Sequence, residues 1–189
     1  MKYLLRFTMI CLFFAAILPG IVAQEKQEKV RTSGSKLTYE HDYLVKLGEM
    51  APDFKITEDS GKEYMLSDLK GSVVMLQFTA SWCGVCRKEM PFIENEIWLK
   101  AKDDGLKVIG IDRDEPLETV KSFKKKIGVT YPLALDPGAD IFGLFAVKKA
   151  GVTRNVIIDR EGKIIFLTRL FERGEFDEMK AVIFKELGK

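Results

Sequence analysis

The chain has 189 residues, of which 47% are hydrophobic and 31% are charged, with 30 basic against 28 acidic residues. These proportions are typical of an ordinary globular protein and exclude a disordered, collagen-like or disulfide-scaffold chain. The net charge of +2 is too small and too dispersed to neutralise a phosphate backbone. We therefore expect no nucleic-acid partner.

Residues 1–23 have the pattern of a secretory signal peptide. Lys2 and Arg6 form a basic start, residues 7–18 are an apolar run, and a Pro-Gly break precedes a small residue at Ala23. The apolar run is shorter than the roughly 20 residues that a membrane-spanning helix needs, which favours a cleaved peptide over the alternative of an uncleaved anchor. The pattern predicts a periplasmic or secreted protein.

A polar linker and one dense domain follow the signal peptide. Residues 24–36 are polar and charged and carry too few apolar side chains to form a core, whereas the apolar pattern is dense over residues 37–189. Cleavage would remove Cys11 and leave equal numbers of acidic and basic residues, with Cys83 and Cys86 as the remaining cysteines. Electrostatic attraction is therefore not how we expect the domain to find its partners.

The apolar pattern of the domain alternates between expected strands and expected helices. Strands are predicted at 54–57 and 64–66, which would form a hairpin, at 73–78, 106–111 and 132–135, and at 156–158 and 164–168, which would form a second hairpin. Helices are predicted after Cys83 through about Lys102, and at 117–127, 139–147 and 175–187. This order predicts an α/β fold in which a mixed central sheet carries helices on both faces.

The main chemical signal is the C-x-x-C motif of Cys83, Gly84, Val85 and Cys86, at the turn from an expected strand into an expected helix. A structural zinc site needs four ligands, and the only histidine, His41, lies before the domain core, where we assign it no role. A structural staple is also disfavoured, because a disulfide that closes so short a loop restricts the unfolded chain little. We expect no metal at the motif.

The motif has a direct redox mechanism. Unpaired N–H groups and the dipole at a helix start favour a thiolate, so Cys83 is expected to be the exposed nucleophile. Cys86, one turn further on, can attack the mixed disulfide that Cys83 forms with a substrate, which closes the Cys83–Cys86 bond and releases the reduced substrate. The pair is then a two-electron carrier that needs no cofactor besides its own disulfide.

Four segments carry a resemblance to a known family: F-T-A-S-W-C-G-V-C at 78–86, A-P-D-F at 51–54, L-S-D-L-K-G at 66–71 and I-D-R-E-G-K-I at 158–164. Together they resemble the thioredoxin fold, and specifically its exported TlpA/ResA-like thiol-disulfide oxidoreductases, over about residues 46–188. The resemblance implies reduction of the disulfides of exported proteins, a membrane dithiol as electron donor and a helical insertion over residues 112–147. We expect a monomer.

The loop that would face the cysteines departs from the family pattern. Family members usually have a cis-proline there, whereas this chain has Thr153 between Val152 and Arg154. A cis bond before a residue other than proline costs about 2.5–4 kcal/mol, so the bond before Thr153 is expected to be trans and the substrate-docking backbone to differ. Pro91 matches the helix-kinking proline of the family, since proline removes a helical hydrogen bond.

Three more residues have candidate roles beside the cysteines. Gln77 stands where thioredoxin has a buried carboxylate that takes the proton of the second cysteine, and glutamine cannot take it. Either Glu89, one turn after Cys86, or water must serve, with a plain helix-surface position for Glu89 as the alternative. Trp82 is expected either in the core or as a partly exposed platform for a substrate chain.

Two other functions stay open. A thiol peroxidase would use the related fold and Arg154 to orient a peroxide, but the peroxidase pattern resembles P-x-x-x-T-x-x-C and this chain has Ala80 in place of the threonine. The second alternative hypothesis is a copper carrier or a non-catalytic binding module. It is disfavoured because copper carriers of this fold resemble C-x-x-x-C with a later histidine, and no histidine follows Cys86.

An acidic cluster at the end of an expected strand, Asp112, Asp114 and Glu115, resembles a magnesium site. Charges in a solvated loop and at a helix start explain the cluster better. We therefore assign it no metal.

Overall fold

The computed structural model describes residues 41–189, so the predicted signal peptide (1–23) and linker (24–36) lie outside the described residues. The strands are β1 (Lys55–Thr57), β2 (Glu63–Met65), β3 (Val73–Thr79), β4 (Leu106–Arg113), β5 (Leu133–Asp136), β6 (Arg154–Ile158) and β7 (Ile164–Arg169). The α-helices are α1 (Gly84–Phe92), α2 (Leu99–Ala101), α3 (Leu117–Ile127), α4 (Phe142–Phe145) and α5 (Arg173–Glu186). Short 3-10 helices span Leu66–Leu69 and Pro137–Ala139, and a π-helical segment spans Ile93–Trp98.

Five strands form one mixed sheet in the order β5-β4-β3-β6-β7, and β1 and β2 form a separate antiparallel hairpin. Strands β3, β4 and β5 are parallel to one another, whereas β6 is antiparallel to both β3 and β7. Both predicted hairpins are confirmed, and so is the α/β class with its mixed central sheet. The central strand, β3, leads directly to the two cysteines.

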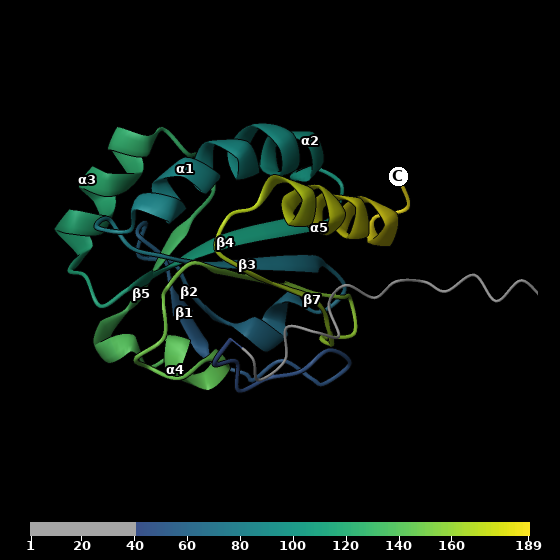
Figure 1. Cartoon of the computed structure of the whole chain (residues 1–189), viewed down its shortest axis with the longest axis horizontal. Helices are drawn as coiled ribbons and strands as arrows, with labels where there is room; N and C mark the ends of the chain where they lie inside the picture. Colours follow the sequence, from purple (N-terminus) through teal and green to yellow (C-terminus); the bar gives the residue numbers. More distant parts are fainter. Residues whose placement is uncertain (1–40) are drawn as a thin grey trace, which may run out of the picture. The chain divides into compact units, whose positions relative to one another are not determined.

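The two faces of the sheet are covered by different elements, because side chains alternate along a strand. Met75 of β3 packs with the buried residues of α3 and α5, whereas Leu76 and Phe78 pack with Phe142 and Phe145 of α4. Figure 1 shows α1, α2, α3 and α5 on one side of the sheet and α4 with the β1–β2 hairpin on the other. Helices therefore lie on both faces, as the sequence predicted.

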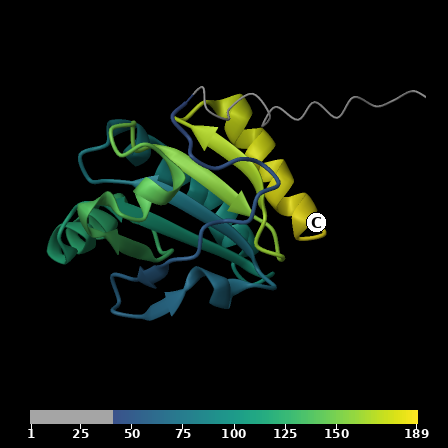
Figure 2. The ribbon, with the colours of Figure 1, turned by 90° about the horizontal axis from the view of Figure 1, so that it is seen from below.

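The segment before β1 crosses the α4 face of the sheet, and Figure 2 shows its dark blue trace over the strands. Backbone hydrogen bonds hold it there, among them those that the N–H groups of Leu44, Gly48 and Ala51 donate to the carbonyls of Phe145, Ile164 and Gly162. The segment thus joins α4 to the β6–β7 hairpin. Within residues 41–189 no helix is both long and apolar enough to cross a membrane.

The long helix predicted after Cys83 is interrupted. Pro91 lies in the last turn of α1, and the π-helical segment begins two residues later. Because proline has no N–H group and crowds the preceding turn, the regular helical hydrogen-bond pattern is not continued there. The side chain of Asn95 donates a hydrogen bond to the carbonyl of Pro91 at 2.7 Å.

The helix predicted at 139–147 is shorter than expected. Asp136 accepts hydrogen bonds from the backbone N–H groups of Ile141 (2.7 Å) and Phe142 (2.9 Å), so its carboxylate partners the amides where α4 begins. Gly138 and Ala139 before it have positive φ angles of 69° and 54°. This backbone forms a turn rather than the first turn of the helix.

Candidate active site

The two cysteines lie where β3 turns into α1. Cys83 is the residue that caps α1, and its Sγ atom accepts a hydrogen bond from the backbone N–H of Cys86 at 3.1 Å. The two Sγ atoms form a disulfide across this first helical turn. The turn before the helix is closed by a hydrogen bond from the Cys83 N–H to the carbonyl of Ala80. The sequence prediction of a dithiol at a helix start is confirmed.

The sulfur atoms are largely covered in this disulfide form. Cys83 is 7% exposed and Cys86 is fully buried, so the expectation that Cys83 is exposed is wrong for the oxidised protein. Trp82, the residue before Cys83, is 60% exposed and lies on the surface rather than in the core. An exposed, flat aromatic side chain therefore lies next to the disulfide.

The loop of Val152 and Thr153 packs directly against the disulfide. The hydroxyl oxygen of Thr153 lies 3.2 Å from Sγ of Cys83 and 3.3 Å from Sγ of Cys86. No peptide bond is cis within residues 41–189, so the bond before Thr153 is trans, as expected for a residue other than proline. Val152 is also buried. The structure therefore brings this loop and both cysteines together.

Arg154, the third residue of the predicted docking loop, is engaged elsewhere. Its guanidinium is buried over the ring of Tyr43, 4.4 Å from the centroid, and donates to the backbone carbonyl of His41 at 2.5 Å. Burial lowers the pKa of the guanidinium below its usual value. The contacts of Arg154 thus anchor the segment before β1, and His41 contributes its backbone carbonyl.

Glu89 lies in a buried polar network under the cysteines. Its carboxylate accepts hydrogen bonds from the side-chain amides of Gln77 (3.3 Å) and Asn155 (2.6 Å). Burial raises the pKa of Glu89 to about 7, although the two hydrogen bonds oppose the shift. The helix-surface position considered for Glu89 is wrong, since the side chain is 1% exposed.

Two more pairs extend this network across the sheet. Gln77 accepts a hydrogen bond from the hydroxyl of Tyr131 at 2.8 Å, and Asn155 also donates to the hydroxyl of Thr168 at 2.9 Å. Gln77 therefore holds one oxygen of the Glu89 carboxylate in place. Sequence reasoning missed Asn155, although an asparagine within the apolar run of β6 was a visible signal of a buried hydrogen-bond partner.

The acidic cluster is bound to the turn that carries the cysteines. Glu115 accepts hydrogen bonds from the backbone N–H (2.5 Å) and the hydroxyl (2.6 Å) of Ser81. Asp112 is fully buried beside Thr79 in the parallel register of β3 and β4, and both its oxygens lack a hydrogen-bond partner within the described residues. Burial and then the charge of Glu115 raise the pKa of Asp112 to about 8.

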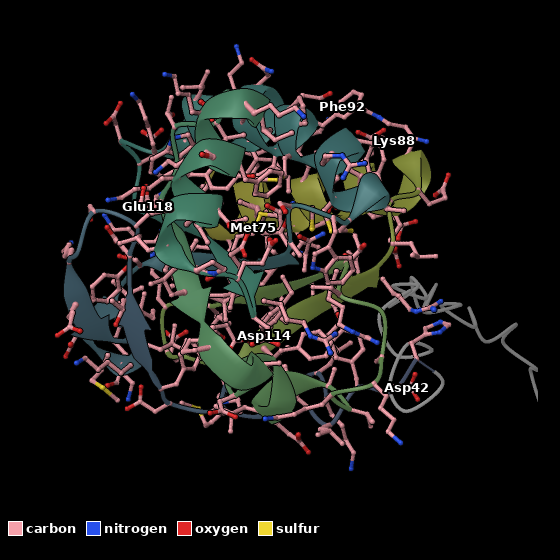
Figure 3. All side chains as sticks on the ribbon, turned by 90° about the vertical axis from the view of Figure 1, so that its left-hand side faces the viewer. Asp42, Met75, Lys88, Phe92, Asp114 and Glu118 are labelled. Carbon is pink, nitrogen blue, oxygen red and sulfur yellow. A yellow bond between two sulfur atoms is a disulfide. The ribbon has the colours of Figure 1, made fainter. Side chains whose placement is uncertain are left out.

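The interpretation of these residues as solvated charges is therefore wrong for Asp112. Asp114 has a structural role, since its carboxylate accepts a hydrogen bond from the N–H of Gly138 at 2.8 Å. Among residues 41–189 no group of three histidine, cysteine or acidic side chains could hold a metal ion. Figure 3 shows Met75 inside the molecule and Lys88 and Phe92 at the outer surface of α1.

Proteins with similar sequences are named for the thiol-disulfide chemistry that this site indicates. The family model described as the AhpC/TSA family matches residues 47–167. The thiol-disulfide oxidoreductase ResA of Bacillus anthracis is 38% identical over 121 residues, which are 64% of this chain and 68% of that protein. ResA of Bacillus subtilis (strain 168) is 33% identical over 118 residues, 62% of this chain and 64% of that protein.

Solved structures give the same result. A solution structure of a candidate protein disulfide isomerase from Bacteroides thetaiotaomicron has a TM-score of 0.76 and 63% identity, and covers 78% of this chain and 94% of its own. A crystal structure of a candidate thiol:disulfide interchange protein DsbE from Chlorobium tepidum has a TM-score of 0.68 and 30% identity, with coverage of 76% and 99%. The chain therefore belongs to the AhpC/TSA family of thioredoxin-fold proteins and, within it, to the ResA-like thiol-disulfide oxidoreductases.

Proposed function

We propose that this protein is an exported dithiol reductase that passes two electrons from Cys83 and Cys86 to the disulfides of other exported proteins. The observation that carries the proposal is the disulfide across the first turn of α1, with Cys83 as the capping residue and Cys86 buried beneath it. A similar protein is named for thiol:disulfide interchange, and another for disulfide isomerisation. Both activities use this dithiol chemistry.

The reaction proceeds in two exchanges. The thiolate of Cys83 attacks one sulfur of the substrate disulfide, a mixed disulfide forms, and the other substrate sulfur leaves as a thiolate. Cys86 then attacks Sγ of Cys83, which breaks the mixed disulfide, releases the second substrate thiolate and closes the Cys83–Cys86 bond. The dithiol is oxidised by two electrons, and the substrate disulfide is reduced to two thiols that take up the protons.

Glu89 is the proton acceptor for Cys86 in this proposal. It lies one helical turn after Cys86 and is buried, and a pKa of about 7 lets it both take up and release a proton near neutral pH. The amides of Gln77 and Asn155 hold its two oxygens in place. The exposed ring of Trp82 is the platform along which the substrate chain lies beside the disulfide.

The compartment and the electron source are part of the proposal. The signal-peptide pattern of residues 1–23 supports export to an oxidising compartment, where a reductase must itself be re-reduced. A membrane protein with its own dithiol is the donor that fits, because it can repeat the same exchange in the opposite direction. The protein acts as a monomer, with no cofactor besides the Cys83–Cys86 disulfide.

The proposal is tested on the full chain, expressed with its signal peptide and purified after export. Equilibration in glutathione buffers is expected to give a reversible two-electron couple, and Cys86→Ala is expected to trap mixed disulfides with exported proteins. Cys83→Ala is the matched control and is expected to trap none. The absence of a reversible couple would overturn the proposal.

The same samples separate the two other functions. Rapid consumption of hydrogen peroxide by Cys86→Ala, at a rate above that of a free thiol, would favour a thiol peroxidase. Retention of one Cu(I) per chain through gel filtration would favour a copper carrier. The contacts of Arg154 with Tyr43 and His41 already leave its guanidinium engaged away from a peroxide.

A further inference from the structure

The side chain of Thr153 makes contacts that a proline at this position could not make. Its hydroxyl oxygen lies 3.2 Å from Sγ of Cys83 and 3.3 Å from Sγ of Cys86, and the residue is 4% exposed. Its backbone is held as well, because the N–H of Leu170 donates to the Thr153 carbonyl at 3.1 Å. A single hydroxyl group is thus fixed at equal reach of both reacting atoms.

The direction of these hydrogen bonds follows from the chemistry of the site. In the disulfide neither sulfur carries a hydrogen, so the hydroxyl of Thr153 is the donor. A hydroxyl has one hydrogen and can rotate, so it serves one sulfur at a time. When a sulfur becomes a thiolate the hydrogen bond gains strength, since bonds to a charged acceptor are about twice as strong as neutral ones.

We propose that the hydroxyl of Thr153 is a switching hydrogen-bond donor, which stabilises the thiolate of Cys83 before attack and the thiolate of Cys86 after the mixed disulfide has formed. The proposal deepens the proposed function and rests on it. Thr153 contacts the reacting atoms directly and is therefore a catalytic residue. It stays protonated throughout, so the proton of Cys86 is still taken up elsewhere.

The hydroxyl of Thr153 is important because the two sulfur atoms have few other hydrogen-bond donors nearby. Besides Thr153, the thiolate of Cys83 has the N–H of Cys86 as a donor at 3.1 Å. For Sγ of Cys86, the other polar atom that the described residues place nearby is the carbonyl oxygen of Phe78, at 4.0 Å, which cannot donate. The hydroxyl is therefore one of two donors for Cys83 and the sole donor for Cys86 within residues 41–189.

The first test measures ionisation of Cys83 without any substrate. In the Cys86→Ala background, the thiolate absorbance at about 240 nm is followed against pH for Thr153→Val, which has the same shape but no hydroxyl, and for Thr153→Ser, which keeps the hydroxyl. Loss of a hydrogen bond to a charged group is expected to raise the midpoint by about one pH unit, a tenfold loss of thiolate below it. Thr153→Ser is expected to restore the original midpoint.

The second test measures the role at Cys86. In this test the Thr153→Val variant keeps both cysteines. An excess of the reduced variant is mixed with a disulfide-bonded peptide, and samples of the reaction are quenched with acid at successive times. Once formed, the mixed disulfide is expected to decay several-fold more slowly than in the wild type, because Cys86 resolves it more slowly, and Thr153→Ser is expected to show the wild-type decay rate. A merely structural role for Thr153 would not separate the serine from the valine variant.

Equal midpoints for wild type and Thr153→Val, or identical behaviour of the serine and valine variants, would overturn the inference. If Thr153→Val does not fold by circular dichroism, Thr153→Ala provides the same loss of the hydroxyl with a smaller side chain. The absorbance titration needs no substrate or donor, so its failure is distinct from failure of the proposed function. The latter is seen as a missing reversible couple in the wild-type protein.

Discussion

The buried carboxyl of Glu89 is expected to make the oxidised protein lose stability as the pH rises, and Glu89→Gln is expected to remove this loss. Burial raises the pKa of Glu89 from 4.5 to about 7 in the folded protein. Between these two values the carboxyl is protonated in the folded chain and ionised in the unfolded chain, so the free energy of unfolding falls with pH. At about 1.4 kcal/mol per pH unit, the loss amounts to about 3 kcal/mol by pH 7.

The assay is unfolding of the oxidised protein in urea between about pH 4 and pH 8.5. The stability of Glu89→Gln relative to the wild type is expected to rise by about 3 kcal/mol across this range, whatever constant offset the new amide brings at low pH. Glu161→Gln, at an exposed turn, controls for the loss of one carboxyl and is expected to run parallel to the wild type. Parallel curves for Glu89→Gln and the wild type would refute the reasoning.

Two further substitutions test the surroundings of the site, the first its packing and the second the ionisation of a buried carboxyl. Gly110→Ala is expected to cost about 1–3 kcal/mol in urea unfolding, because an added Cβ would lie 2.4 Å from a methyl carbon of the buried Leu133. Gly151→Ala, which has open space, is expected to change stability by less than about 0.5 kcal/mol, and equal costs would contradict the packing argument. Asp112→Asn is expected to gain stability over the wild type as the pH rises from about 4 to 8, because burial and Glu115 raise the pKa of Asp112 to about 8. A difference from the wild type that stays the same over this range would contradict it.

The fold could be predicted where one local signal decides an element. The helix expected at 117–127 has the same bounds as α3, since a proline precedes it and a glycine with a φ angle of 82° follows it. Strand β4 is longer than expected because Asp112 and Arg113 pair with β5. For the break in the helix after Pro91, the proline itself was the only signal in the sequence. The spacing of apolar residues gave no second signal, because it differs little between an α-helix and a π-helical segment over six residues.

The site likewise contains residues that a local signal predicts and residues that it does not. Cys83 and Cys86 could be found because a strand, a turn and a helix start are adjacent in the sequence. The burial of Glu89 could not, because it depends on Asn155, which lies 66 residues further on in β6. The burial of Asp112 could not be predicted for a similar reason, since its environment is formed by β3 and by the turn that Glu115 binds.

The strand that leads to the cysteines is the innermost strand of the sheet. All seven residues of β3 are buried, and β3 is paired with β4 on one side and β6 on the other. Backbone amides in such a strand exchange with solvent only when the whole sheet opens, whereas β5 and β7 at the edges can open locally. The disulfide spans only three positions and adds little to this protection. The protein can therefore gain and lose its disulfide through many cycles within one folded state.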